Sequence, residues 1–251
     1  MPALLDQLRQ GKTLIFGHRG ASGNAPMNTL PAFELAAEHG ADGIELDVWL
    51  SKDGEVVVIH DTAVDKTTNG TGHIQQMSLA ELQELDAGSW FAESFQGTRI
   101  PTLDEVFETV GKRLFINVEL KSITVKTDGL EKAVAEKIRQ HNLADCVIIS
   151  SFNPFALRRF RREMPEVPIG FLYAPDIPRY LQFILLGFPH EARHPSQDMV
   201  NAAYMAWARR RKYCVNVWTV NDPQRALELR DLGVNGIITD YPGKMREALR
   251  G

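Results

Sequence analysis

Residues 44–61 read Ile-Glu-Leu-Asp-Val-Trp-Leu-Ser-Lys-Asp-Gly-Glu-Val-Val-Val-Ile-His-Asp, two apolar runs on either side of a polar tetrapeptide that contains glycine. This pattern predicts a strand, a tight turn and a returning strand. Glu45 and Asp47 are two residues apart, so an extended chain directs both carboxylates to the same face. The returning run ends at His60. The hairpin is therefore expected to bring two carboxylates and one imidazole into a small volume.

A bound cation is the simplest reason for two carboxylates on an otherwise apolar strand. If the turn is centred between Lys52 and Asp53, Glu45 lies opposite His60 in the hairpin. Burying a pair of like charges is unfavourable unless a positive charge lies between them. We therefore expect a divalent metal ion beside the hairpin.

The length of 251 residues suits one domain of barrel size or two small domains. The net charge of −4 gives no reason to expect a nucleic-acid partner or binding to anionic membranes. No apolar run approaches the ~20 residues of a membrane-spanning helix, so no stable membrane insertion is expected. The N-terminus lacks the pattern of a secretory signal, which predicts a cytoplasmic protein. Cys146 and Cys214 stand in apolar runs without ligand spacing and are predicted to be buried and unpaired.

Strands and helices alternate along most of the chain, which indicates a parallel sheet. Eight such units in about 250 residues favour a single domain, residues 1–251, folded as a closed (β/α)8 TIM barrel. An open doubly wound sheet is the alternative, but no glycine-rich dinucleotide turn supports it. The predicted barrel strands are Leu14–Gly17, Gly43–Asp47, Leu114–Leu120, Cys146–Ser150, Pro168–Tyr173, Glu191–Pro195, Tyr213–Val220 and Gly236–Thr239. The predicted helices are Thr29–His39, Thr102–Val110, Leu130–His141, Pro154–Glu163, Ile177–Phe188, Asp198–Arg210, Asp222–Leu232 and a last one from near Gly243.

Residues 62–100 interrupt this alternation after the hairpin. They begin with a polar, glycine-rich stretch and continue with a short helix in which Ser78 and Glu81 have capping-box spacing. A segment of about 40 residues buries too little core to fold alone. We therefore expect an insertion that covers the C-terminal face of the barrel.

Polar side chains concentrate at the C-terminal ends of the first three barrel strands, the end at which TIM barrels carry their functional residues. Three carboxylates without other ligands are typical of a Mg²⁺ or Ca²⁺ site, and two cations suit phosphate oxygens. These side chains are His18 and Arg19 after the first strand, Glu45, Asp47 and the returning His60 at the second, and Glu119 and Lys121 at the third.

This set of side chains indicates phosphoryl chemistry. His18 and His60 could act as acid and base across a phosphorus centre, while a metal polarises the phosphoryl group. A purely structural ion pair with Glu119 is an alternative role for Lys121. His194 ends the sixth predicted strand, so it is expected to face the same rim and to contact substrate.

Eight short motifs resemble, in order, those of the glycerophosphodiester phosphodiesterase family, and they span nearly the whole chain. The resemblance implies a (β/α)8 barrel with an insertion after the histidine that follows strand two. It also implies hydrolysis of a small-molecule glycerophosphodiester, such as glycerophosphocholine or glycerophosphoethanolamine, to sn-glycerol 3-phosphate and an alcohol. The motifs are His18-Arg19-Gly20, Pro26-x-Asn28-Thr29, Glu45-Leu-Asp47-Val, Val58-Ile-His60-Asp61, Val118-Glu119-Leu-Lys121, Ser150-Ser151-Phe152, Val217-Trp218-Thr219-Val-Asn221 and Gly236-Ile-Ile-Thr-Asp240-Tyr-Pro242.

The same resemblance implies roles for individual residues. His18 and His60 would be acid and base, in an order left open, and Arg19 and Lys121 would line the phosphate site. The oligomeric state also stays open. The one divalent metal, Mg²⁺ or Ca²⁺ with Mn²⁺ as a further option, would be held by Glu45, Asp47 and Glu119, and the pocket would be lined by Ser151, Phe152 and Trp218.

One position departs from the family's pattern. Met27 stands where the family usually has a glutamate, so a carboxylate that would orient Arg19 or a metal ligand is missing. This departure would fit a non-catalytic binding barrel. A lysophospholipase D-type activity is a second alternative, and it would explain the apolar segment Tyr180–Phe188, unless that segment packs on the barrel as an ordinary helix.

Overall fold

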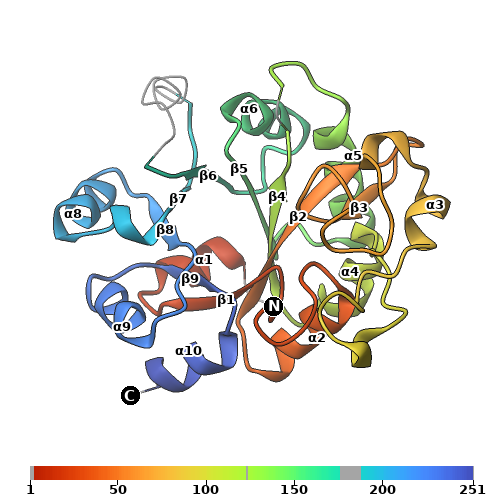
Figure 1. The fold of residues 1–251 in the computed structure, drawn as a ribbon. Coiled ribbons are helices and arrows are strands. Elements are labelled where there is room, and N and C mark those ends of the chain that lie inside the picture. The colour runs from red at the N-terminus through yellow and green to blue at the C-terminus, as the bar shows by residue number, and fades with distance from the viewer. Residues whose placement is uncertain (1–2, 123, 176–187, 251) are drawn as a thin grey trace.

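The computed structural model describes residues 3–122, 124–175 and 188–250, which form a barrel of parallel strands surrounded by helices (Figure 1). Within these ranges the barrel strands are β1 (Leu14–His18), β2 (Gly43–Leu50), β4 (Phe115–Leu120), β5 (Val147–Ser151), β6 (Ile169–Tyr173), β7 (Ala192–Pro195), β8 (Cys214–Val217) and β9 (Gly236–Thr239). β1 pairs with both β2 and β9, which closes the sheet, and the other neighbours follow chain order. The predicted (β/α)8 barrel is confirmed.

Helices cover the outside of the barrel, and their bounds lie within a few residues of the predicted ones. Their starts carry the expected signals: proline opens several of them, and Thr102 forms a capping box with Glu105. The predicted helix Ile177–Phe188 lies, except for Phe188, outside the described residues. The helices are α2 (Leu30–Glu38), α4 (Leu103–Val110), α5 (Leu130–His141), α6 (Pro154–Glu163), α8 (Ala202–Arg210), α9 (Pro223–Asp231) and α10 (Pro242–Leu249).

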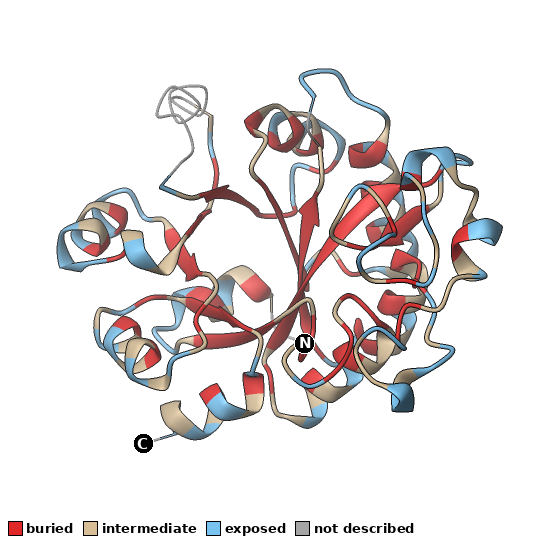
Figure 2. Cartoon of the chain, viewed as in Figure 1, coloured by how far each residue is buried: buried red, intermediate tan, exposed pale blue. Residues whose placement is uncertain are grey.

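The strands are almost wholly buried, whereas the helices expose their outer faces (Figure 2). Cys146 and Cys214 are buried free thiols, as predicted. Among the described residues, no helix combines the length and the hydropathy that crossing a membrane requires.

A short helix, α1 (Leu4–Arg9), precedes the barrel and was not predicted from the sequence. Its Leu4 and Leu8 are completely buried. The Leu4 backbone N–H donates to the carbonyl of Asp145, and Asn235 Nδ2 donates to the carbonyl of Leu8, both at 2.7 Å. Asp145 and Asn235 stand just before β5 and β9, so α1 closes the N-terminal end of the barrel. Any site must therefore open at the opposite end.

The hairpin has a register one residue away from the predicted one. β3 (Val56–Val58) is antiparallel to the outer part of β2, and its last residue pairs with Val48. The turn is centred on Asp53, because Gly54 adopts a positive φ of 87° that lengthens the loop. A regular strand in this register would direct His60 to the face opposite the carboxylates. β3 ends before that point, and the irregular chain that follows still brings His60 to the carboxylate side.

Residues 62–100 pack beside β2 and β3 (Figure 1). Ile74 is completely buried in a hydrophobic cluster that also contains Trp49 and Val57 of the hairpin. The predicted capping box is present at the start of α3 (Leu79–Gln83). Because the cluster is shared with the hairpin, this segment supports the chain that carries His60.

Candidate active site

Three carboxylates lie together at the C-terminal end of the barrel. Glu45 and Asp47 project from β2 and Glu119 from β4, and Asp47 pairs in register with Glu119. All three are buried, and one oxygen of each lies within 4.8 Å of the others. Parallel strands direct residues at the same level to the same face, so this grouping follows from the register. The structure thus brings together the three carboxylates that the sequence singled out.

Two cations and one amide surround Asp47. Lys121 Nζ lies 3.0 Å from Asp47 Oδ1 and 2.6 Å from Glu119 Oε1. Arg19 Nε lies 3.3 Å from Asp47 Oδ2, close enough for an ion pair but not aligned for a hydrogen bond. Asn28 Nδ2 donates to Asp47 at 2.8 Å from a left-handed backbone conformation (φ 59°), which asparagine tolerates. The negative charge of Asp47 is therefore compensated without a metal.

These contacts make the three carboxyl groups unequal. Burial alone would raise the pKa of Asp47, but Lys121 and Arg19 hold it well below its usual range. Burial raises the pKa of Glu119 to about 7 even though Lys121 opposes the rise. Burial and the charge of Asp47 raise the pKa of Glu45 well above its ordinary value. A cation bound between these groups would favour their ionised forms, so metal binding would release protons.

The donor set fits a hard divalent cation. It contains only carboxylate oxygens, which are ligands preferred by Mg²⁺, Ca²⁺ and Mn²⁺, and the described residues add no thiolate or imidazole to the cluster. Glu45 is oriented from outside the cluster, because its Oε2 accepts the backbone N–H of Arg19 at 3.2 Å. Glu45, Asp47 and Glu119 could therefore hold one metal ion.

Two histidines face a cavity of about 150 Å³ that Glu45 and Glu119 also line. His18 Nδ1 lies 2.6 Å from Asp240 Oδ1, and His60 Nδ1 lies 2.8 Å from Asp61 Oδ1. Each ring therefore uses Nδ1 for a carboxylate and keeps Nε2 for another partner. Burial lowers the pKa of His60, so its ring is neutral at pH 7.

The other side of the cavity is apolar. Phe152, Leu172, Trp218 and Ile238 line it. The Phe152 and Trp218 rings meet edge to face, with centroids 5.6 Å apart, and Trp218 Nε1 donates to the carbonyl of His194 at 2.7 Å. A cavity with one charged and one apolar wall suits a small molecule that carries a phosphate next to carbon chains.

His194 does not line this cavity, so its expected position at the rim is wrong. Its ring is completely buried inside the barrel, with Nε2 3.0 Å from Asn216 Nδ2 and Nδ1 3.5 Å from Asn117 Nδ2. The residue lies one position before the end of β7 and points inward, one layer below the rim. Ser151 is also absent from the cavity lining, since its Oγ donates to the carbonyl of Leu120 at 2.8 Å and ties β5 to β4.

The buried His194 makes stability depend on pH. Burial lowers its pKa to about 3 from an ordinary value of 6.5. The unfolded chain therefore binds a proton below about pH 6.5 that the folded chain does not bind, and stability falls as the pH falls. We expect His194→Gln to reduce the pH slope of the unfolding free energy near pH 5 by about 1.4 kcal/mol per pH unit. Urea denaturation at several pH values measures the slope, and equal slopes for both proteins would contradict this account.

Sequence reasoning assigns no role to two polar residues that the structure places at the site. Asp240 directly follows β9, and Asn221 lies in the loop between β8 and α9. Asn221 Nδ2 donates to Asp240 Oδ2 at 2.5 Å, and Ser22 Oγ donates to Asp240 Oδ1 at 3.0 Å. A signal for Asp240 exists in the sequence, because it stands at the end of a strand whose C-terminus reaches the functional rim.

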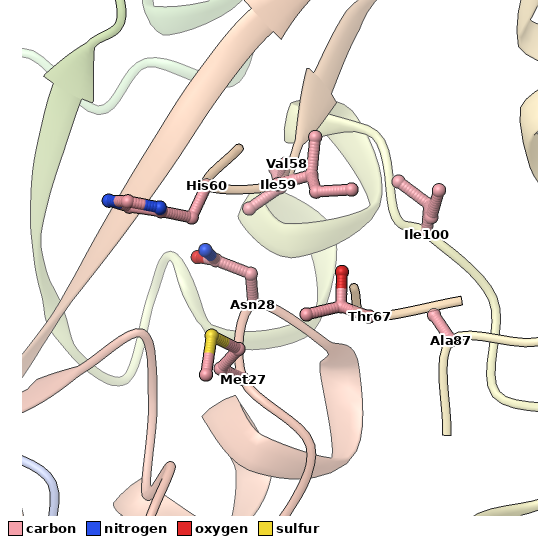
Figure 3. A pocket seen from close by; sticks show the side chains of 8 residues that line it. All are labelled: Met27, Asn28, Val58, Ile59, His60, Thr67, Ala87 and Ile100. Carbon is pink, nitrogen blue, oxygen red and sulfur yellow. The ribbon is translucent and has the colours of Figure 1, made fainter. Parts of the chain in front are cut away.

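Met27 lies next to the charged cluster. Arg19 Nη1 is 3.3 Å from Met27 Sδ. Figure 3 shows the Asn28 side chain between those of Met27 and His60, where all three line a narrow slot. A thioether is only a weak hydrogen-bond acceptor, so the Arg19 guanidinium stays close to Asp47.

We expect Met27→Glu to tighten divalent-metal binding. A carboxylate at this position would pair with Arg19 and draw its charge away from Asp47, leaving more negative charge for the metal. An effect of about 1 kcal/mol would increase the affinity about fivefold. Calorimetric titration with Ca²⁺ and with Mg²⁺ measures it. Met27→Gln is the matched control, because it keeps the shape without the charge; equal affinities for the two variants would refute the argument.

Comparison with known proteins gives a consistent result. The profile of the glycerophosphoryl diester phosphodiesterase family matches residues 18–244. A glycerophosphodiester phosphodiesterase of Caldanaerobacter subterraneus subsp. tengcongensis is 41% identical over 242 residues, covering 95% of this chain and 98% of that protein. The structure of an Oleispira antarctica phosphodiesterase in complex with the product sn-glycerol-3-phosphate is similar with a TM-score of 0.87 and 34% identity, covering 97% of this chain and 99% of that one. A human lysophospholipase D is 28% identical, covering 99% of this chain and 90% of that protein. The chain belongs to the glycerophosphoryl diester phosphodiesterase family, as its motifs indicated.

Proposed function

We propose that this chain is a metal-dependent phosphodiesterase that hydrolyses glycerophosphodiesters to sn-glycerol 3-phosphate and an alcohol. One observation carries the proposal: a buried carboxylate cluster and two histidines, each with a carboxylate at Nδ1, face a single cavity. Family membership supports it, as do the relative named for this activity and the similar structure that holds the product.

Glu45, Asp47 and Glu119 would hold the divalent ion. Mg²⁺ and Ca²⁺ are the preferred candidates and Mn²⁺ is also suited, since all three favour oxygen ligands. A metal bound there would polarise the phosphoryl group and offset its negative charge.

The chain's own groups would bind the phosphate and move the protons. Arg19 and Lys121 offer N–H donors to phosphate oxygens at the edge of the cavity. One histidine, His18 or His60, takes the proton of the attacking hydroxyl as the new P–O bond forms. The other protonates the oxygen of the departing alcohol as the old P–O bond breaks. If the attacking hydroxyl is the substrate's own 2-hydroxyl, a cyclic phosphate forms, and water then opens it with the two histidines in exchanged roles. One water is consumed in this way, and both histidines return to their starting protonation states.

The apolar wall would contact the carbon portion of the substrate. Phe152 and Trp218 both line the cavity, with their rings edge to face, and could pack on glycerol or on a cationic head group. Phe152 also lines a shallow groove of about 370 Å³ with Val125 and Phe155, and Val125 is 66% exposed. This continuity favours lysophospholipids as a second candidate substrate class, and the human relative named lysophospholipase D is consistent with it.

We also propose that residues 62–100 are part of a single domain, residues 1–251, and cover the C-terminal face on the side of His60. Two observations support this. The segment shares its hydrophobic cluster with the hairpin. Thr67 and Ala87 line the slot beside His60.

A substrate panel tests the proposed activity. The protein is assayed with Mg²⁺ on glycerophosphocholine, glycerophosphoethanolamine and lysophosphatidylcholine, and the phosphate-containing products are identified. We expect sn-glycerol 3-phosphate from the first two substrates. Cleavage of lysophosphatidylcholine alone would favour the lysophospholipase D-type activity. Binding of the diesters without turnover of any of them would favour a non-catalytic binding barrel.

A further inference from the structure

Asp240 contacts one of the two histidines from the side away from the cavity. His18 Nδ1 lies 2.6 Å from Asp240 Oδ1. Burial would raise the pKa of Asp240, but hydrogen bonds from His18, Asn221 and Ser22 hold it below its ordinary value, so the group is ionised at pH 7. An ionised carboxylate can only accept hydrogen bonds. The proton of the neutral ring must therefore be on Nδ1, which leaves Nε2 of His18 as the basic nitrogen.

Asn221 fixes the orientation of this carboxylate. Asn221 Oδ1 accepts two hydrogen bonds, from the Asp240 backbone N–H at 2.9 Å and from Thr239 Oγ1 at 3.1 Å. The side-chain oxygen of Asn221 is thereby identified, and its Nδ2 must point to Asp240, to which it donates at 2.5 Å. Asp240 Oδ2 is occupied by this bond, so Oδ1 is the oxygen left for His18 and for Ser22.

We propose that Asp240, oriented by Asn221, is the positioning residue that fixes the tautomer and the ring orientation of His18. The expected effect on catalysis rests on the proposed function, whereas the tautomer of His18 does not depend on it. His60 has a different arrangement, because the second oxygen of its partner Asp61 pairs with Lys66, whose side chain is 79% exposed. The hydrogen bonds of Asp240 and Asn221 link His18, at the end of β1, to the loop after β8 and to the residue that follows β9, so three segments of the barrel hold the His18 ring.

The fixed amide of Asn221 gives Asp240→Asn a defined result. The new side chain keeps its oxygen on the Asn221 Nδ2 donor and must direct its own amide nitrogen to His18. His18 Nδ1 then becomes the acceptor, and the ring proton moves to Nε2. A histidine in that tautomer cannot accept a proton from the cavity side, a change that costs about 10²–10⁴-fold in rate where a histidine acts as base or acid.

Exchanging the two side chains should reverse this effect. In the double variant Asp240→Asn with Asn221→Asp, the carboxylate at 221 accepts from the backbone N–H of residue 240, from Thr239 and from the new amide nitrogen. The oxygen of the new amide then faces His18, so Nδ1 carries the proton again. The double variant has the same composition as the native pair and a satisfied hydrogen-bond network.

Two measurements on the full chain test the proposal. The ¹⁵N shifts of the His18 ring nitrogens are recorded at alkaline pH, with His18→Gln to assign the signals. The values of kcat and KM are measured on glycerophosphocholine with Mg²⁺. We expect Asp240→Asn to move the ring proton from Nδ1 to Nε2 and to lower kcat at least about 100-fold with little change in KM. The double variant should restore the Nδ1–H tautomer and raise kcat at least about tenfold above that of Asp240→Asn. Asp231→Asn, a control at a side chain 70% exposed, should change neither.

The NMR result separates this proposal from the proposed function. If the native protein cleaves no diester but the tautomer follows the predicted pattern, the positioning role stands and the proposed function fails. If the ring proton of His18 stays on Nδ1 in Asp240→Asn, or if the double variant folds but regains neither tautomer nor rate, the positioning role is refuted. A loss of kcat without a change of tautomer would make Asp240 a merely structural residue and would also refute it.

Discussion

His60→Ala is expected to lower turnover by about 10²–10⁴-fold, the usual contribution of one acid–base group, while leaving metal affinity largely intact. The reason is geometric. His60 faces the cavity but does not belong to the cluster of Glu45, Asp47 and Glu119 that could hold the ion. Steady-state kinetics on glycerophosphocholine and calorimetric titration with Ca²⁺ measure the two quantities independently.

Glu45→Gln provides the contrast, since it removes a charge from the metal cluster and should lower both turnover and metal affinity. His73→Ala, which changes an exposed histidine in the segment 62–100, should alter neither quantity. If His60→Ala lost metal affinity as fully as Glu45→Gln, His60 would be a ligand and its acid–base role would be excluded.

Lys121→Met is expected to destabilise the metal-free protein by about 3–5 kcal/mol at pH 7, the effect of removing one partner of a buried ion pair. Lys121 is 13% exposed and lies within 3.0 Å of both Asp47 and Glu119. Without it, Arg19 is the one cation of the described residues that still forms an ion pair with the buried cluster. Saturating Ca²⁺ should restore much of the lost stability, because ligand binding to the folded state alone raises its stability.

Chemical denaturation with EDTA and with Ca²⁺ measures this effect. Lys132→Met is the matched control. The Lys132 side chain is 69% exposed and pairs with Glu136 on the surface of α5, so its loss should cost less than about 1 kcal/mol. A loss of that small size for Lys121→Met without metal would show that the carboxylates do not depend on the lysine. If Ca²⁺ did not reduce the loss of stability in Lys121→Met, a metal ion could not replace the lysine as the positive charge beside Asp47 and Glu119, and the account would be wrong.

The barrel could be predicted because its signals are local. Most barrel strands are short, largely apolar runs, and most of the helices between them begin with a capping side chain or a proline. The alternation of the two kinds of element fits few other folds. The convergence of Glu45, Asp47 and Glu119 could be predicted as well, since spacing by two on neighbouring parallel strands determines which face they share.

Features that depend on atomic detail could not be predicted. The hairpin register follows from the left-handed conformation of Gly54. Val56–Val58 is a uniform apolar run, so its sequence does not distinguish this register from one shifted by a residue. The position of His194 near the end of a strand predicts a place at the rim, but the depth of a side chain inside the barrel depends on how far β7 extends. The partnership of His18 and Asp240 joins residues 222 positions apart, and only barrel closure through β1 and β9 brings them together.

Met27 shows how a departure from the family's pattern can leave the rest of a site in place. The Arg19 side chain, which a glutamate at this position would attract, contacts the thioether and stays close to Asp47. The three carboxylates still form one cluster, and two of them, Glu45 and Glu119, line the same cavity as both histidines. We therefore expect the substitution to tune metal affinity rather than to abolish catalysis.

The most direct test of metal-dependent diester hydrolysis is the rate of sn-glycerol 3-phosphate release from glycerophosphocholine before and after chelation. The protein is treated with EDTA, dialysed, and assayed alone and with Mg²⁺, Ca²⁺ or Mn²⁺ in turn. The arrangement of Glu45, Asp47 and Glu119 predicts no release without metal and recovery with at least one of the three ions. Undiminished release from the metal-free protein, or no release with any ion, would contradict it.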